Sequence, residues 1–194
     1  MSALPELRPG AARIRASYLK LLLECVRRLP DAESAEILNR LGTHVAAVED
    51  STRVDWLPYE VPVAFLSAAD GVLGRGGLRA LYLTATRCLL HGNLLAPLFS
   101  AFANLFELSP ERMFRSAPAG FASIWRDAGD IGVESVASGC VVLHHSPIPE
   151  VLRVSTFLEA TAASFEALPV ECGRSASSQV EFDGGDAARY IIRW

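Results

Sequence analysis

The sequence predicts an α+β fold in which a helical N-terminal two-thirds packs on a small antiparallel sheet. Up to about residue 125, apolar residues recur at three- and four-residue spacing, which is the period of an amphipathic helix. After Gly129 the pattern changes to short alternating, β-prone stretches that are separated by turn residues, with one helical stretch between them. Helices that bury their apolar faces against one side of such a sheet are the simplest packing of these elements.

The size and composition are those of one globular unit. The chain has 194 residues, of which 51% are hydrophobic and 21% charged. A chain of this length buries a sizeable core without disulfides or a structural metal. The first ten residues contain Pro5, Pro9 and Gly10, which is typical of a loose tail. We therefore expect a tail at residues 1–10 and a single domain at residues 11–194.

Two helices are predicted in the first fifty residues. The first comes after the tail, carries an apolar stripe from Ile14 to Leu29, and ends at Pro30. Asp31 can cap the second, whose apolar residues recur as far as Val48.

Three more helices are predicted before residue 106. They cover Asp55–Gly71, Leu78–Leu90 and Leu94–Leu105, with the glycine-rich stretch 71–77 as the turn between the first two. Ser109, Pro110 and Glu111 form a strong helix start, and Pro118 divides the stretch from there to about Trp125 into two helices.

The last third predicts two hairpins around a helix. Residues 131–136 and 140–145 are β-prone and flank Ser138-Gly139, which suits a hairpin turn. A helix is predicted next, over about 150–168. Alternating residues around 179–182 and 189–194 then form two strands, joined by a turn at 183–186.

Charge and hydropathy exclude two classes of partner. The net charge is −4, whereas a nucleic-acid-binding domain needs a positive footprint. The N-terminal residues do not resemble a secretory signal, and no apolar run approaches the ~18 residues of a membrane span. We expect a cytoplasmic protein that binds no nucleic acid and does not span a membrane.

The cysteines and histidines do not predict a metal site. Four single cysteines stand far apart, as expected of buried, inert thiols, and no histidine pair has ligand spacing. His144 and His145 are adjacent on a predicted strand and should point to opposite faces. His91 closes a helix, where an imidazole is favourable near the negative end of the dipole. A haem ligand at His91 or His144 is the alternative.

No catalytic motif is recognisable, and we predict that the chain is not an enzyme. The run GVLGRGG at 71–77 comes after a predicted helix and lacks the lysine of a P-loop. We interpret it as a turn, with an anion site that uses Arg75 and Arg79 as the alternative. The sequence contains no nucleophile elbow of the Gly-x-Ser-x-Gly type.

The aromatic residues of the helical part suggest an apolar ligand pocket. Such pockets are lined by aromatic and aliphatic side chains with few polar groups. We predict that its walls are Trp56, Phe65, Phe102 and Trp125, with Arg75 or Arg87 as the charged contact. The alternative is that these rings only fill the core.

Several sequence features, in this order, resemble a known family. They are Trp56-Leu57-Pro58, the Gly-x-Gly-Gly of 74–77, the run 109–118 (SPERMFRSAP) and the terminal RYIIRW of 189–194. Over roughly residues 35–194 the chain resembles a paralogous family of myxobacterial proteins. More distantly it is similar to the fold of haem–nitric-oxide-binding domains, the 4-vinyl-reductase domain and TRAPP-type trafficking subunits.

The resemblance implies a helical part against a twisted antiparallel sheet that serves ligand binding or protein assembly. The haem-binding members share a Tyr-x-Ser-x-Arg contact to the haem propionates, and that motif is absent here. We therefore predict no cofactor. The leading hypothesis is a non-enzymatic regulatory or scaffolding module that binds a small apolar ligand or a protein partner. The alternatives are a haem or gas sensor, a small enzyme with a non-sequential site, and a homodimer built on one helical face.

Overall fold

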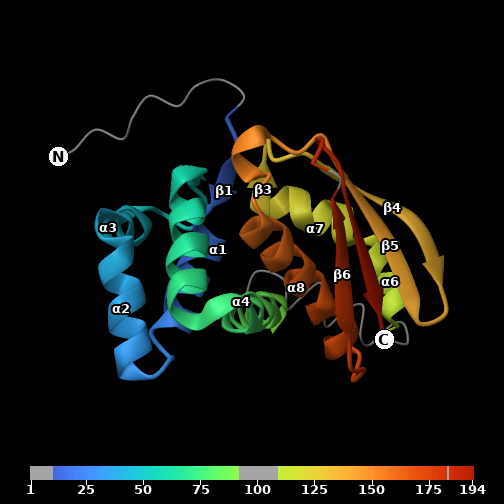
Figure 1. Cartoon of the computed structure of the whole chain (residues 1–194), viewed down its shortest axis with the longest axis horizontal. Helices are drawn as coiled ribbons and strands as arrows, with labels where there is room; N and C mark the ends of the chain where they lie inside the picture. The colour runs from blue at the N-terminus through green and yellow to red at the C-terminus, as the bar shows by residue number, and fades with distance from the viewer. Residues whose placement is uncertain (1–10, 92–108, 183) are drawn as a thin grey trace.

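The computed structural model describes residues 11–91, 109–182 and 184–194. It confirms the predicted α+β class, with helices packed on an antiparallel sheet (Figure 1). The helices are α1 (Ala16–Val26), α2 (Asp31–Leu41), α3 (Thr43–Asp50), α4 (Glu60–His91), α6 (Pro110–Arg115), α7 (Ala117–Ile124), the 3-10 turn η1 (Glu150–Leu152) and α8 (Ser155–Glu171). The strands are β1 (Arg13–Arg15), β2 (Trp56–Pro58), β3 (Trp125–Arg126), β4 (Asp130–Ala137), β5 (Cys140–Ser146), β6 (Ser177–Phe182) and β7 (Ala188–Arg193).

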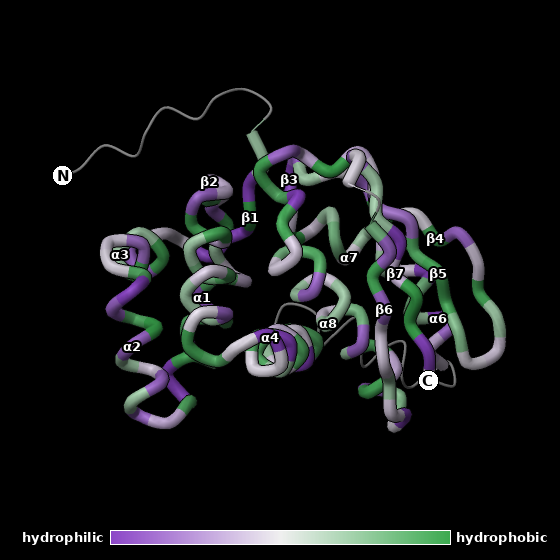
Figure 2. The backbone as a smooth tube through the Cα atoms, in the orientation of Figure 1, coloured by the Kyte–Doolittle hydropathy of each residue, from purple (hydrophilic) through white to green (hydrophobic). Residues whose placement is uncertain are grey.

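The described strands form two antiparallel sheets. The larger has the order β4-β5-β7-β6, so that β5 and β7 occupy its centre. Both predicted hairpins are confirmed, because β4 pairs with β5 and β6 pairs with β7. Figure 2 shows hydrophobic and hydrophilic residues alternating along these strands, as expected for a sheet with one buried face. The smaller sheet has the order β2-β1-β3.

Helices α6, α7 and α8 cover the buried face of the larger sheet, with α6 and α7 against β4. The helix α8 packs against β6 and β7 on one side and against α4 on the other (Figure 1). Further from the sheet, α4 also contacts α1 and α2. A continuous hydrophobic core runs through these layers, from Ile37 in α2 to Tyr190 in β7. None of the helices in the described part of the chain combines the length and hydropathy that a membrane span requires.

The helix predicted for Asp55–Gly71 was wrong at its start, whereas the predicted break between two helices within 71–77 is confirmed and is confined to Gly74. Trp56–Pro58 is a strand, because it pairs with Arg13–Arg15. The range Glu60–His91 consists of two helical stretches that meet at a kink at Gly74, which is itself non-helical and has a φ of 67° that suits a residue without a Cβ. The two predicted helices are therefore present, and the break between them is shorter than predicted.

Other predicted boundaries also shift. The first helix begins only at Ala16, because the three residues before it form β1. Gly42, at a φ of 53°, separates the predicted second helix into α2 and α3. The helix expected from about 150 begins at Ser155, after η1. Trp125 belongs to β3 and not to a helix. The predicted tail 1–10 and helix 94–105 lie outside the described residues.

Candidate functional site

An internal pocket lies between the helices and has a volume of about 110 Å³. Its described walls come from α1, α4, α7 and α8, with Trp125 of β3 at one side. Most of the lining is apolar, including Leu66, Phe121, Phe157 and Leu168. The pocket also borders exposed residues of α7, Gly120 and Ser123, so that it reaches the surface there.

Three hydroxyl groups meet at one wall of this pocket. The hydroxyl of buried Tyr18 lies 3.2 Å from Thr86 Oγ1 and 3.4 Å from Ser164 Oγ. Ser164 Oγ donates its hydrogen to the Ala160 carbonyl at 2.9 Å. Hydroxyl pairs usually approach to ~2.7–2.8 Å, so both contacts of Tyr18 are long. The Tyr18 hydroxyl can therefore turn toward a polar atom of a ligand without breaking a strong hydrogen bond.

Burial fixes the protonation state of this wall. Desolvation raises the pKa of Tyr18, and it raises the pKa of Tyr82, which lines the same pocket, well above its usual value. Both phenols therefore stay neutral at physiological pH. The wall offers hydrogen-bond donors and acceptors without charge, which suits a small neutral ligand.

Behind the pocket residues Phe121 and Phe157, which form its aromatic wall, lies a buried histidine. Both of its ring nitrogens form hydrogen bonds. The Nε2–H of His145 donates to the Ala128 carbonyl at 2.9 Å, and Nδ1 accepts from the Tyr190 hydroxyl at 3.1 Å. Phe121 contacts the imidazole edge-on, with centroids 5.1 Å apart, and Phe157 also packs on it. Desolvation lowers the pKa of His145 to about 4, so that it is neutral. His145 supports the pocket wall but does not line it.

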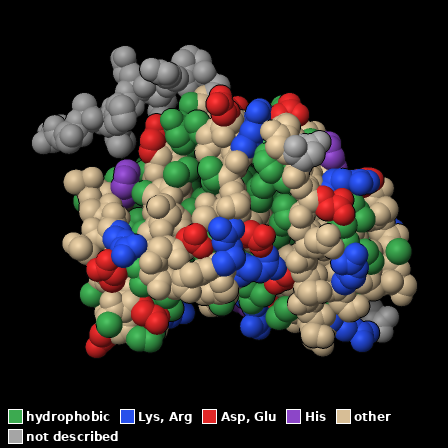
Figure 3. Space-filling view, viewed as in Figure 1, with side chains coloured by type: hydrophobic (Ala, Val, Ile, Leu, Met, Phe, Trp, Pro, Cys, Tyr) green, Lys and Arg blue, Asp and Glu red, His purple; other side chains and the backbone are tan. Residues whose placement is uncertain are grey.

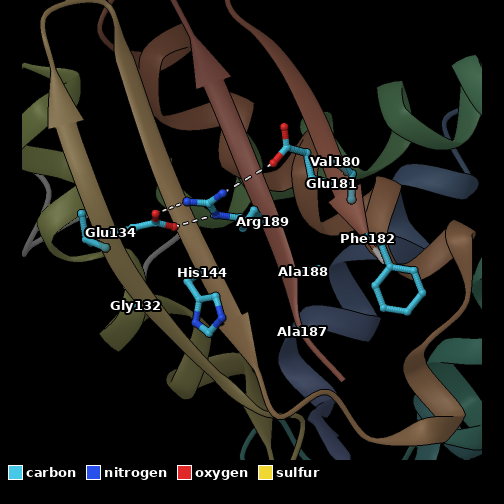
Figure 4. Close-up of a pocket in the computed structure, with 10 residues that line it drawn as sticks. Gly132, Glu134, His144, Val180, Glu181, Phe182, Ala187, Ala188 and Arg189 are labelled. Carbon is cyan, nitrogen blue, oxygen red and sulfur yellow. Dashed lines mark hydrogen bonds and ion pairs between the residues drawn. The ribbon is translucent and has the colours of Figure 1, made fainter. Parts of the chain in front are cut away.

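A second, open groove of about 1050 Å³ lies over the outer face of the larger sheet. Figure 4 shows Arg189 reaching between Glu134 of β4 and Glu181 of β6, with the His144 ring beside them. Arg189 Nε donates to Glu134 Oε2 at 2.8 Å, and this hydrogen bond lowers the pKa of Glu134. Because the cation already has two carboxylate neighbours, the groove offers a ligand few unpaired groups.

Among the described residues, only one predicted wall residue lines the internal pocket. Trp125 does so, stacked near Phe121 with ring centroids 6.4 Å apart. Phe65 is buried in the core, and its neighbour Leu66 faces the pocket instead. Trp56 lies on β2 at the outer side of the small sheet. Phe102 lies outside the described residues.

The predicted charged contacts point elsewhere. Arg75 forms an ion pair with Asp70 at 3.3 Å and donates to Ser155 at 3.2 Å. Arg87 pairs with Glu171 at 2.6 Å. Arg79, the partner of Arg75 in the alternative anion site, contacts Glu159 and Glu166. Figure 3 shows positively and negatively charged side chains gathered near the centre of the view, where α4 passes α8 in Figure 1. The guanidinium groups that an anion site would need are therefore already paired with carboxylates of the chain.

The histidine expected at a helix end is surface-exposed. His91 is the last residue of α4, its side chain is 63% exposed, and its Nε2 contacts Glu171. His144 and His145 do point to opposite faces, because the first is exposed and the second is fully buried. Among the described residues, no cluster of three or more His, Cys, Asp or Glu side chains could hold a metal ion.

The cysteines are free thiols, and two of them are held in the protonated form. Burial raises the pKa of Cys25 to about 11, and it raises the pKa of Cys172 to about 11. The Cys172 thiol donates to the Met113 sulfur at 3.3 Å. Such thiols are poor nucleophiles at neutral pH.

The three hydroxyl residues of the pocket were not predicted from the sequence. Tyr18 stands in the apolar stripe of the first helix, and Thr86 and Ser164 stand in otherwise apolar helical stretches. A polar side chain on a buried helical face is a usable signal, because it needs a partner. That the three belong together could not be inferred from positions so far apart.

Comparison with known proteins shows a shared fold at low sequence identity. No family model and no curated protein matches the sequence. Solved H-NOX structures match over almost the whole chain. The A71G variant of the K. algicida H-NOX protein has a TM-score of 0.61 at 10% identity and covers 93% of this chain and 96% of its own. The IWP-051-bound H-NOX from Shewanella woodyi gives 0.60 at 10% identity, with 92% of this chain and 93% of its own covered.

A third solved structure agrees with these two. The F78L variant of Tt H-NOX has a TM-score of 0.59 at 13% identity and covers 93% of this chain and 94% of its own. At such identity the likeness shows the fold alone. The K. algicida protein is an Fe(II) unliganded form, and the Shewanella woodyi protein is in the Fe(II)CO ligation state. A further H-NOX structure, with a TM-score of 0.55 at 9% identity, is described by the distortion of its haem.

Proposed function

We propose that this chain is a non-enzymatic regulatory module that binds a small, neutral, largely apolar ligand in the internal pocket, without haem. The observation that carries the proposal is the pocket itself, an apolar cavity with one uncharged hydroxyl wall. Ligand sites typically combine such a lining with a few placed polar groups.

The pocket volume limits the ligand to a few heavy atoms. A dry apolar cavity of roughly 150 Å³ binds benzene or xenon, and the pocket here measures about 110 Å³. A small hydrophobic molecule with one hydroxyl or carbonyl group would place its polar atom on the Tyr18, Thr86 and Ser164 wall. A dissolved diatomic gas would fit as well.

Haem, in contrast, does not fit the described lining of the pocket. The described lining contains no histidine and no cysteine, and residues 92–108 contain neither in their sequence. Both nitrogens of His145 already have partners. Pockets for drug-sized ligands begin at roughly 300 Å³, above the 110 Å³ present here. The donor set and the space therefore both argue against an iron porphyrin.

Xenon and benzene are suitable probes of the pocket. We expect xenon to shift the ¹⁵N–¹H resonances of pocket residues such as Thr86 and Ser164 in a saturable manner, and benzene to raise the melting temperature. Trp125→Ala removes one wall of the pocket, and we expect it to abolish the benzene effect.

A matched pair of glycine variants makes the test specific. A Cβ at Gly120, which borders the pocket, would meet no atom within 4 Å, and the same holds for exposed Gly76, which does not border it. Gly120→Leu should weaken xenon binding at least about fivefold, whereas Gly76→Leu should leave it unchanged. An absence of saturable binding of either probe would refute the ligand proposal. A stoichiometric Soret band after haemin addition would overturn its haem-free form.

A further inference from the structure

The outer face of the small sheet gathers three arginines around one tryptophan. Side chains of alternate residues share a face of a strand, which places Arg13 and Arg15 of β1 on the same side. Their cross-strand partners on that side are Trp56 of β2 and Arg126 of β3. We call these four residues the arginine face. Ile14, Leu57 and Trp125 occupy the opposite, inward side.

Two guanidiniums contact the same indole. The Arg15 Cζ lies 4.3 Å from the Trp56 ring centroid, and the Arg126 Cζ lies 4.4 Å from it. Arg15 is held there because its Nε donates to the Ser123 carbonyl at 2.9 Å and its Nη1 reaches the Val54 carbonyl at 3.4 Å. The stacking orders both cations without neutralising them.

The arginine face carries an excess of positive charge. Asp127 pairs with Arg13 at 2.8 Å, but in the described part of the chain neither Arg15 nor Arg126 has a carboxylate at ion-pair distance. Arg13 and Arg126 also stand directly opposite each other, an arrangement that like charges disfavour. The Nε of Arg13 is buried without a hydrogen-bond partner among the described residues. The chain as a whole has a net charge of −4, so the charge of this face is opposite in sign to that of the whole chain.

The composition of the surface favours a protein partner. Val54, whose carbonyl contacts Arg15, is the most exposed large hydrophobic residue in the described part of the chain, at 69%. Tryptophan and arginine are among the residues most enriched at energetic centres of protein interfaces. The indole already stacks with guanidiniums, so it is a poor platform for a nucleic-acid base.

We infer that the arginine face docks an acidic segment of a partner protein. Carboxylates of the segment pair with Arg126 and Arg15, and an apolar side chain beside them covers Val54 and the edge of Trp56. The inference is independent of the pocket ligand, because none of the four arginine-face residues lines the pocket.

Peptide titration of the intact chain, monitored by NMR, tests the inference. The probe is the peptide acetyl-ELEELE-amide, with acetyl-KLKKLK-amide as its charge-reversed counterpart. We expect the acidic peptide alone to shift the Trp56 indole N–H and the Arg126 Nε–H resonances, with an affinity that falls as salt rises.

Two variants of equal charge change separate the arginine face from general attraction. Arg126→Glu should weaken the acidic peptide roughly tenfold. Arg174→Glu, at an exposed arginine just after α8, should change the affinity less than about twofold. Both variants should keep the melting temperature of the unaltered chain, which shows that they fold.

Four results would overturn the inference. The first is an equal loss of affinity for the acidic peptide in the two variants, and the second is the absence of a shift at Trp56 with that peptide. The third is the same set of shifts with inorganic phosphate or with phosphatidylserine vesicles in place of the peptide. The fourth is peptide binding that appears only after deletion of residues 1–10. The last result would assign the face to the chain's own N-terminal segment.

Discussion

The two faces of the larger sheet place polar side chains in opposite environments. The neighbouring histidines of β5, His144 and His145, show the difference. On the inner face, His145 is fully buried, and each of its nitrogens has one defined partner. On the outer face, His144 is exposed beside the Glu134, Arg189 and Glu181 side chains (Figure 4). Polar groups inside must be satisfied by specific atoms, whereas outside water replaces a missing partner. Substitutions on the inner face should therefore cost much more.

The largest effect should come from His145→Ala. The substitution leaves the Tyr190 hydroxyl and the Ala128 carbonyl without this partner and opens a cavity behind the aromatic wall. We expect the free energy of unfolding to fall by about 4 kcal/mol. His144→Ala is the matched control and should change it by less than about 0.5 kcal/mol. Urea denaturation of both variants measures the difference, and similar losses would contradict the comparison.

The second effect is a dependence of stability on pH. The folded pKa of His145, about 4, lies below the ordinary value of 6.5, so the unfolded chain takes up the proton first. The stabilisation is complete above pH 6.5 and is lost as the pH falls toward 4. It amounts to about 3 kcal/mol at most.

Carboxylates also titrate between pH 6.5 and 4 and change the stability there. The contribution of His145 is therefore measured by comparing the stability of variants with that of the unaltered chain across this pH range. His145→Gln should lose stability less steeply between pH 6.5 and 4, whereas His144→Gln should retain the slope of the unaltered chain. Denaturation midpoints at several pH values measure both slopes. Parallel profiles for all three proteins would show that His145 does not carry the effect.

The smallest effect compares two arginine ion pairs. Arg79 joins α4 to Glu159 and Glu166 of α8 and donates to Ser178 of β6 at 2.8 Å. Arg79→Ala should cost about 2 kcal/mol, because the Glu166 carboxylate, with a side chain only 10% exposed, loses this partner. Arg189→Ala on the outer face should leave the urea midpoint unchanged within error, because solvent screens its pairs. The reverse ranking would overturn this view of the two faces.

The sequence predicted the elements that depend on local patterns. The hairpins 130–146 and 177–193 and the start of α6 at Pro110 are encoded by alternation and by helix-start residues. The strands β1, β2 and β3 were missed, because two or three residues are too few to show alternation and their pairing is set by partners far along the chain. The glycine-rich stretch 71–77 correctly predicted a break between two helices, but the break is confined to a kink at Gly74.

The candidate site was less predictable than the fold. Aromatic content indicated a pocket, and Trp125 does line it, but a hydrophobic pattern does not distinguish a filled core from a lined cavity. Phe65 illustrates this, because it has the pattern of a wall residue and is a core residue. Tyr18 and Ser164 meet only through the packing of α1 and α8 near α4, which no local pattern encodes.

The two-residue strand β3 joins a residue of the internal pocket to a residue of the arginine face by one peptide bond. Trp125 faces the pocket, and Arg126 faces outward to Trp56. A ligand that displaced the backbone at Trp125 would also move Arg126, the next residue of β3. Thermodynamic linkage then requires that each binding event change the free energy of the other by the same amount. Two adjacent residues on a strand would in that case connect an internal cavity to an external surface without any rearrangement of helices.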